Sequence, residues 1–195
     1  MKYIKDWRLF ESEYWDKVLK LRTLGLSGEW TEKLIDWLDK KQQNPTQQFD
    51  SLDLTGCNLK GLPPDLNQVN SYVILAGSLI ETLPERMVIG KSLWISDCPE
   101  LRQLPAELVI GENLSIARCP KLETLPASLQ VGKDFVIVDA PIRTLSQQAH
   151  IEGRATMMDT FISRNEFMDW AREAGALDPF HMGHDGPRLG VRETP

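Results

Sequence analysis

Three cysteines and two histidines are the side chains in this sequence best suited to metal binding or redox chemistry. Cys57, Cys98 and Cys119 could form a disulfide or supply thiolates to zinc, and His181 and His184 could supply two imidazole ligands. No histidine lies near the cysteines, and the two histidines stand in a stretch rich in glycine and proline without apolar periodicity. The pattern therefore favours reduced structural thiols and a flexible tail, and we expect neither a metal nor another cofactor.

Sequence motifs of the common catalytic mechanisms are not found. The sequence contains no Gly-x-Ser-x-Gly, no His-Glu-x-x-His and no phosphate-binding Gly-x-x-x-x-Gly-Lys-Ser/Thr. The formal net charge of −6 argues against a nucleic-acid ligand, because such binding depends on Lys and Arg side chains that neutralise phosphates. We therefore expect a protein that is not an enzyme and does not bind nucleic acid.

The regular spacing of the cysteines follows from a sequence repeat. Leu-Pro dipeptides begin at four positions that are 21 residues apart: Leu62, Leu83, Leu104 and Leu125. Upstream of each dipeptide, two apolar residues bracket a third residue, which is the period of a β-strand whose apolar pair points inward. About five such repeats are legible, and an interval of roughly 20 to 29 residues indicates a solenoid of stacked units. The strands should therefore form one parallel sheet.

One position in the turn after each strand is small in every repeat. It lies five residues after the first member of the apolar pair, and we call its occupants the ladder residues: Cys57, Ser78, Cys98, Cys119 and Ala140. A turn packed against the next coil requires a small side chain, so the cysteines should be buried as small apolar residues. Free buried thiols also fit a reducing compartment.

A second apolar pair follows the Leu-Pro dipeptide in the middle repeats. It immediately precedes Gly90, Gly111 or Gly132. This pattern predicts another extended segment, closed by a residue that can adopt a positive φ. We therefore expect little or no helix on the convex side of the solenoid.

The repeat motif Leu-x-Leu-x-x-(Cys/Ser)-x-Leu-x-x-Leu-Pro-x-x-Leu resembles the short leucine-rich repeats of bacterial LPX-type effectors. The similarity spans roughly residues 49 to 149, and the wording of the third and fourth repeats is also similar to repeats of plant immune receptors. The resemblance implies a leucine-rich-repeat solenoid with a parallel β-sheet, an extended convex side and α-helical caps at both ends.

Helical periodicity is confined to the ends of the chain. Apolar residues three and four positions apart predict two amphipathic helices before residue 45. Near the other end, Ser163 and Glu166 form a capping box, and Phe167, Trp170 and Ala171 begin an apolar stripe. The predicted organisation is an N-terminal helical cap at 1–45, leucine-rich repeats at 46–154, a C-terminal helical cap at 155–176 and a flexible tail at 177–195.

The residues that point away from the core on the predicted sheet are the candidates for binding. Four of them are apolar or aromatic where solvent favours polar side chains: Tyr72, Ile74, Trp94 and Val136. An outward tryptophan with aromatic and branched neighbours is typical of a protein-binding hot spot. Charged residues at equivalent strand ends would add a rim that selects orientation: Asp97, Arg118 and Asp139. Alternatively, a terminal segment folds over this face and covers it.

Two functions are compatible with these features. The first is a non-enzymatic interaction module that binds a protein partner on the concave sheet face, as a bacterial effector or regulator. The second follows from the resemblance, because related effectors often join such repeats to a ubiquitin-ligase domain with a catalytic cysteine. The chain would then be the substrate-recognition part of a larger enzyme system. The roughly 40 residues after the last repeat contain no cysteine, so we do not expect the catalytic domain in this chain.

The cellular location is predicted from the lack of patterns typical of membrane spans and signal peptides. Its apolar stretches are too short for a membrane span, and the charged start MKYIKDWRLF is unlike a signal peptide. We therefore expect a cytoplasmic monomer without a membrane partner. Export into a host cell would require a specialised secretion system.

Overall fold

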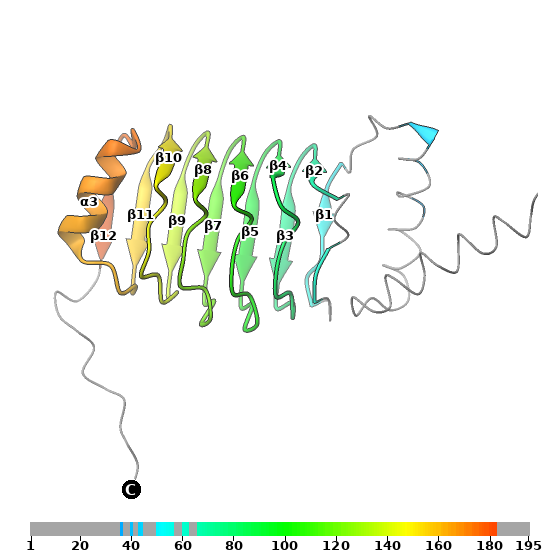
Figure 1. Ribbon diagram of the computed structural model, residues 1–195, viewed down its shortest axis with the longest axis horizontal. Helices are drawn as coiled ribbons and strands as arrows, with labels where there is room; N and C mark the ends of the chain where they lie inside the picture. The colour runs from blue at the N-terminus through cyan, green and yellow to red at the C-terminus, as the bar shows by residue number, and fades with distance from the viewer. Residues whose placement is uncertain are drawn as a thin grey trace, which may run out of the picture.

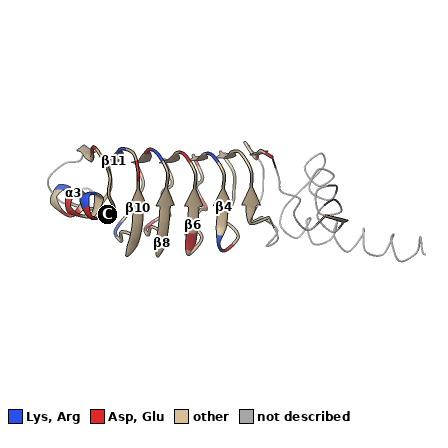
Figure 2. Ribbon diagram, turned by 90° about the horizontal axis from the view of Figure 1, so that it is seen from above, with Lys and Arg blue, Asp and Glu red and all other residues tan. Residues whose placement is uncertain are grey.

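A parallel β-solenoid of about six turns follows from the repeat, as the computed structural model of the chain shows (Figure 1). The structure describes residues 36, 40, 43–44, 50–56, 60–62 and 66–182 of the 195. Each of the first five coils contributes one strand to each of two sheets, the sixth contributes to the larger sheet only, and all strand pairs are parallel. In Figures 1 and 2 the described coils stand in a nearly straight row.

The larger sheet has seven strands and contains the apolar pairs recognised in the sequence. In spatial order its strands are β1 (Leu52–Asp53), β3 (Val73–Ala76), β5 (Leu93–Ser96), β7 (Leu114–Ala117), β9 (Phe135–Val138), β11 (Ala155–Met158) and β12 (Phe180–Met182). The second sheet has five strands, which are β10 (Gln148–Ile151), β8 (Ser128–Val131), β6 (Glu107–Ile110), β4 (Met87–Ile89) and β2 (Gln68–Val69). The predicted second extended segment is therefore present.

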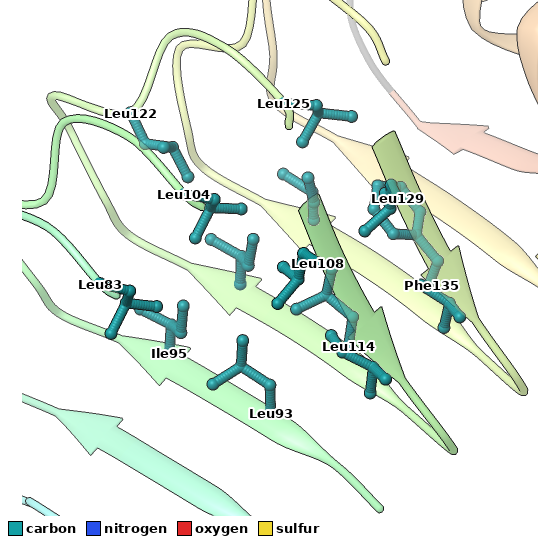
Figure 3. Close-up of a cluster of buried hydrophobic side chains, with 14 of the residues drawn as sticks. Leu83, Leu93, Ile95, Leu104, Leu108, Leu114, Leu122, Leu125, Leu129 and Phe135 are labelled. Atoms are coloured by element: carbon teal, nitrogen blue, oxygen red, sulfur yellow. The ribbon is translucent and has the colours of Figure 1, made fainter. Parts of the chain in front are cut away.

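The core lies between the two sheets and is built from equivalent residues stacked coil upon coil. Leu93, Leu114 and Phe135 occupy one register position of the larger sheet and are fully buried. Figure 3 shows how leucines from the sheets and from the Leu-Pro segments meet in this interior. Burial of one such side chain contributes about 1.5–3 kcal/mol, so the repeated leucines supply most of the driving force for stacking.

The ladder residues form a buried column, as predicted. Ser78, Cys98, Cys119 and Ala140 are all inaccessible to solvent, and the equivalent position of the sixth coil is Thr160. The thiol of Cys98 donates a hydrogen bond to the carbonyl oxygen of Leu75 at 2.8 Å, and both described cysteines are free. Hydrogen bonding with Cys98, together with burial, raises the pKa of the Cys119 thiol, so that side chain stays protonated. Cys57 lies outside the described residues.

The glycines that end the second sheet are required for a different reason from the one predicted. Positive φ among the described glycines is confined to Gly56, Gly77 and Gly175. At Gly90, an added Cβ would lie 2.0 Å from the carbonyl oxygen of Asn70 in the preceding coil. Gly111 and Gly132 have the same relation to the coil before each of them, at 2.2 and 2.3 Å. These glycines therefore permit close backbone contact between coils.

The fifth coil replaces the proline of the Leu-Pro dipeptide with Ser146. Pro84, Pro105 and Pro126 of the preceding coils are buried, and Ser146 is buried as well. Its hydroxyl donates to the carbonyl oxygen of Pro126 at 2.6 Å, and its own carbonyl oxygen accepts a hydrogen bond from the indole of Trp170 at 3.0 Å. The departure from the repeat thus joins the last coils to the segment that closes the solenoid.

Helix α3 (Arg164–Glu173) closes the C-terminal end of the stack. Its N-cap is Ser163, whose side chain accepts a hydrogen bond from the backbone N–H of Glu166, as the capping box predicts. Phe167 and Ala171 are buried, and the Trp170 ring lies 5.5 Å from that of Phe135 in the fifth coil. These contacts cover the apolar end of the core.

The structure differs from the predicted boundaries on both sides of α3. Residues 155–158, placed at the start of the C-terminal cap, form strand β11 and belong to a sixth coil. Residues 180–182, placed in the flexible tail, form β12, which pairs with β11. The Leu-Pro interval did not predict the sixth coil, because that coil lacks a Leu-Pro dipeptide. Most of the predicted N-terminal cap lies outside the described residues, and residues 36, 40 and 43 are helical.

Candidate functional site

The outward side of the seven-stranded sheet carries a continuous row of side chains, one from each strand. Strand register places the exposed Asp53 of β1 beside Ile74, and then come Trp94, Ser115, Val136, Thr156 and Phe180. A second outward row runs parallel to it and consists of Ala76, Ser96, Ala117, Val138 and Met158. We call these two rows the outer face.

Aromatic side chains stand near both ends of the outer face. Trp94 is 41% exposed and lies beside Tyr72, with ring centroids 6.0 Å apart. Phe180 is 50% exposed at the edge strand β12. Aromatic groups with this much accessible surface are able to insert into a partner, whereas the intervening side chains are half-buried and form a flatter floor.

The residues of the outer face that lie on β3 to β11, and Phe180 on β12, are all uncharged. The equivalent row of the five-stranded sheet reads Gln68, Val88, Val109, Gln130 and His150 and is more polar. Figure 2 shows charged segments mainly in the turns between strands and on α3. From β3 onward, one broad side of the solenoid is therefore uncharged and largely apolar, with its charges at the margins.

A column of left-handed residues borders the outer face at the carboxyl ends of the strands. Every coil has a residue with positive φ at this corner, and we call the set the corner column: Gly56, Gly77, Asp97, Arg118, Asp139 and Asp159. The first two are glycines, which adopt this conformation without steric cost. The other four are exposed and charged. The three predicted rim residues, Asp97, Arg118 and Asp139, are thus adjacent members of one column.

Within the corner column, Arg118 bonds to Asp97 rather than to Asp139. Its Nε and one terminal nitrogen each donate to a carboxylate oxygen of Asp97 at 2.6 Å. This hydrogen bonding lowers the pKa of Asp97 and raises the pKa of Arg118. Asp139 has no side-chain hydrogen bond or ion pair in the part of the chain that the structure describes.

The opposite margin of the outer face is polar and tightly bonded. Arg154 donates to the carboxylate of Asp134 at 2.9 Å, and that hydrogen bonding lowers the pKa of Asp134. One coil earlier, the side-chain amide of Asn113 donates to the Ser92 hydroxyl at 3.3 Å. These groups join successive coils and leave fewer polar atoms available for a ligand than the corner column does.

A third line of residues, beyond the corner column, is apolar again. It consists of Leu79, Pro99, Pro120, Pro141 and Phe161, of which Phe161 is 51% exposed. Between this line and the corner column, coils four to six form a pocket of about 370 Å³. Its lining includes Arg118, Asp139 and Asp159 on one side and Pro120, Pro141 and Phe161 on the other, with Ala140 and Thr160 between them.

The predicted site residues thus fall into two neighbouring groups. Tyr72, Ile74 and Trp94 lie together at one end of the outer face, while Val136 shares their side of the sheet two strands beyond Trp94. The sequence did not reveal Phe180 or Phe161. Both lie beyond the last Leu-Pro repeat, where the sequence period no longer indicates which residues face outward.

Of the two histidines considered for metal binding, the structure describes His181. His181 is buried in β12, its Nε2 lies 3.2 Å from the carbonyl oxygen of Ile162, and its ring lies 5.7 Å from that of Phe167. His184 lies outside the described residues. Among the residues with assigned structure, no group of three or more His, Cys, Asp or Glu side chains is placed to hold a metal ion.

No helix within the described part of the chain is long and apolar enough to cross a membrane. No protein-family model matches the chain, and no curated protein matches it. Its surface chemistry is therefore the basis for proposing a function.

Proposed function

We propose that the chain is a non-enzymatic interaction module that binds a protein partner on the outer face. The observation that supports this most directly is the uncharged and largely apolar surface that runs from Ile74 and Trp94 to Phe180. Such a surface with exposed aromatic side chains and polar margins has the composition of a protein interface core and its rim. The nearly straight row of coils favours a partner whose contacting surface is flat or extended.

We further propose that the solenoid is of the leucine-rich-repeat type and serves as a bacterial effector or regulator in the cytoplasm. The 21-residue Leu-Pro interval and the buried ladder support the repeat assignment. The free, buried thiols of Cys98 and Cys119 fit a reducing compartment. The bacterial assignment rests on the resemblance of the repeat motif to the repeats of bacterial LPX-type effectors.

Trp94 is the anchor by which this function can be tested. Trp94→Ala should weaken binding by about 2 kcal/mol or more, because central aromatic side chains dominate the energy of protein interfaces. It should change the thermal midpoint much less, since 41% of the residue is exposed. Val88→Ala is a matched control, because Val88 is 40% exposed on the other sheet.

The measurement begins with affinity capture from source-cell lysate by the wild type and the two variants. A partner identified by mass spectrometry is then titrated against each purified protein. Capture by wild type and Val88→Ala but not by Trp94→Ala would support the proposal. Equal affinity of all three proteins would contradict it, and so would a Trp94→Ala variant that unfolds while its folded fraction binds normally.

A further inference from the structure

We propose that the pocket between the corner column and Phe161 accepts a tyrosine side chain of the protein that docks on the outer face. This inference deepens the proposed function and rests on it for the presence of a protein partner. The pocket combines an apolar wall, formed by Pro120, Pro141 and Phe161, with a polar wall that includes Arg118 and Asp139. An occupant therefore needs both a large apolar body and a hydrogen-bonding group.

The polar wall presents opposite charges side by side. Arg118 and Asp139 are neighbours in the corner column, on successive coils. The pKa of Arg118 is raised by hydrogen bonding with Asp97 and, to a smaller extent, by the charge of Asp139. Asp159 also lines the pocket and already interacts with another group. A cation would therefore meet Arg118, and an anion would meet Asp139 and Asp159, so a neutral group fits this wall better than an ion.

A hydroxyl group can use both members of the polar wall, because it donates one hydrogen bond and accepts others. The carboxylate of Asp139 is an acceptor. A guanidinium has more N–H groups than the two that Arg118 donates to Asp97, so this side chain can still act as a donor. The polar end of the occupant is therefore expected to be a hydroxyl.

The apolar wall selects the body of the occupant. Phe161 is 51% exposed, and the guanidinium of Arg143 lies over its ring, 4.1 Å from the centroid. The rest of the exposed ring is able to contact a second aromatic ring in a tilted or offset arrangement. Serine and threonine lack a large apolar body, phenylalanine and leucine lack a hydrogen-bonding group, and the tryptophan indole only donates. Tyrosine combines an aromatic ring with a hydroxyl.

The backbone around the pocket is held in place without a ligand. The N–H of Phe161 donates to the carbonyl oxygen of Ile142 at 3.1 Å, and the N–H of Ile142 donates to that of Ala140 at 2.8 Å. The rings of Pro120 and Pro141 fix φ at two further positions of the lining. A pocket that is formed in advance loses little conformational entropy on binding, which favours affinity.

The position of the pocket links it to the outer face. Val138 and Met158 are the last outward residues of β9 and β11, and Asp139 and Asp159 follow them directly. A partner segment that crosses the outer face along either strand therefore reaches the pocket at the strand's carboxyl end. Apolar residues followed by a tyrosine would complement both surfaces, and the polar contact would fix the orientation of the partner.

The experiment uses small probes, so that it does not require the partner. N-acetyl-L-tyrosine amide is titrated into the isotope-labelled full chain, and backbone amide shifts are followed by NMR. N-acetyl-L-phenylalanine amide is the matched probe, because it lacks only the hydroxyl. We expect saturable shifts at Asp139, Thr160 and Phe161 with the tyrosine probe, and about ten-fold weaker binding of the phenylalanine probe.

This comparison needs the wild type alone, so it does not depend on whether a variant folds. Equal binding of the two probes would overturn the proposal. Tighter binding of N-acetyl-L-arginine amide than of the tyrosine probe would also overturn it, because the pocket would then prefer a cation. Shifts of the same amides that depend on protein concentration without a probe would show that a second copy of the chain occupies the pocket, with the same consequence.

Removing the aromatic wall should weaken the tyrosine probe. Phe161→Ala is expected to reduce its affinity about ten-fold, because the contact between the two rings is lost. Leu79→Ala is the matched control. Leu79 belongs to the same line of residues in the second coil, is 40% exposed and lies outside the pocket lining, so its replacement should leave probe binding unchanged. Equal loss in both variants would contradict the proposal.

Asp139→Gly tests the acceptor. Glycine occupies this corner position in the first two coils, at Gly56 and Gly77, so it fits the positive φ and the thermal midpoint should change little. Without the carboxylate, the preference for the tyrosine over the phenylalanine probe should fall from about ten-fold to about three-fold, since Arg118 can still donate. An unchanged preference in this variant would contradict the proposal.

The outcome is separable from that of the proposed function. If the tyrosine probe is preferred but Trp94→Ala does not affect the partner, the outer-face function fails and the pocket stands. If the partner depends on Trp94 but the wild type does not distinguish the tyrosine and phenylalanine probes, the pocket proposal fails alone.

Discussion

Glycine has two distinct uses in this solenoid, and single residues show the difference. Gly77 occupies the left-handed corner of its coil at φ +64, and a Cβ there would have no atom within 4 Å. Gly90 has no positive φ, yet a Cβ there would lie 2.0 Å from a backbone oxygen. Gly77 is required because the backbone adopts a positive φ there, and Gly90 is required because the neighbouring coil leaves no room for a Cβ.

Alanine substitution should separate these two requirements. Gly77→Ala should lower the free energy of unfolding by about 1 kcal/mol, the cost of the left-handed conformation for a residue with a Cβ. Gly90→Ala should cost about 3 kcal/mol, because the obstructing atom belongs to the backbone of the neighbouring coil and the coils must move apart. Urea denaturation of both variants gives the comparison. An equal cost would show that coil spacing adapts freely.

At the scale of the elements, ion pairs join successive coils at similar places. Asp97 pairs with Arg118, Glu100 with Lys121, and Asp134 with Arg154, in each case 20 or 21 residues apart. The hydrogen bond to the basic partner lowers the pKa of each carboxyl group. Because these pairs are exposed, each is expected to contribute little by itself.

These lowered pKa values predict an acid-sensitive part of the stability. A carboxyl group whose pKa is lower in the folded than in the unfolded protein stabilises the fold above its ordinary pKa. That contribution is lost as pH falls through the folded value. The ordinary values here are 3.8 for Asp and 4.5 for Glu, so the loss should occur below about pH 4.5.

The measurement is the thermal midpoint between pH 6 and pH 2.5. Replacing the three basic partners, as Arg118→Met, Lys121→Met and Arg154→Met together, should reduce the fall of the midpoint in acid. An unchanged acid dependence in the triple variant would show that other groups cause it.

At the scale of the whole molecule, the closing segment protects an apolar end. Helix α3 covers Phe135, and the N–H of Ile151 donates to the carbonyl oxygen of Ala174 at 2.8 Å. A chain that ends at Phe161 lacks both α3 and β12 and should self-associate, because terminal caps keep a stacked array soluble. Light scattering after size exclusion measures this association. A monomeric, folded truncation would show the segment to be dispensable.

The sequence predicted the regular middle of the molecule well and its C-terminal end less well. The 21-residue interval sufficed to locate the buried pairs and the ladder, because each coil repeats the environment of the one before. It could not reveal β11 or β12, since Ala155–Met158 has no Leu-Pro dipeptide after it and Phe180–Met182 pairs across the intervening helix. The pocket could not be predicted from the sequence either, because side chains from three coils form it.

Register partners in the successive coils from β1 to β11 are always 20 or 21 residues apart, and this spacing has a kinetic consequence. Each coil can close onto its neighbour by forming a short chain loop, and the entropic cost of closure is nearly the same at every step. Folding can therefore start at any adjacent pair of coils and spread in both directions. Because a terminal coil has one neighbour and a central coil has two, amide hydrogens should exchange fastest at the ends of the stack and slowest in β5, β7 and β9.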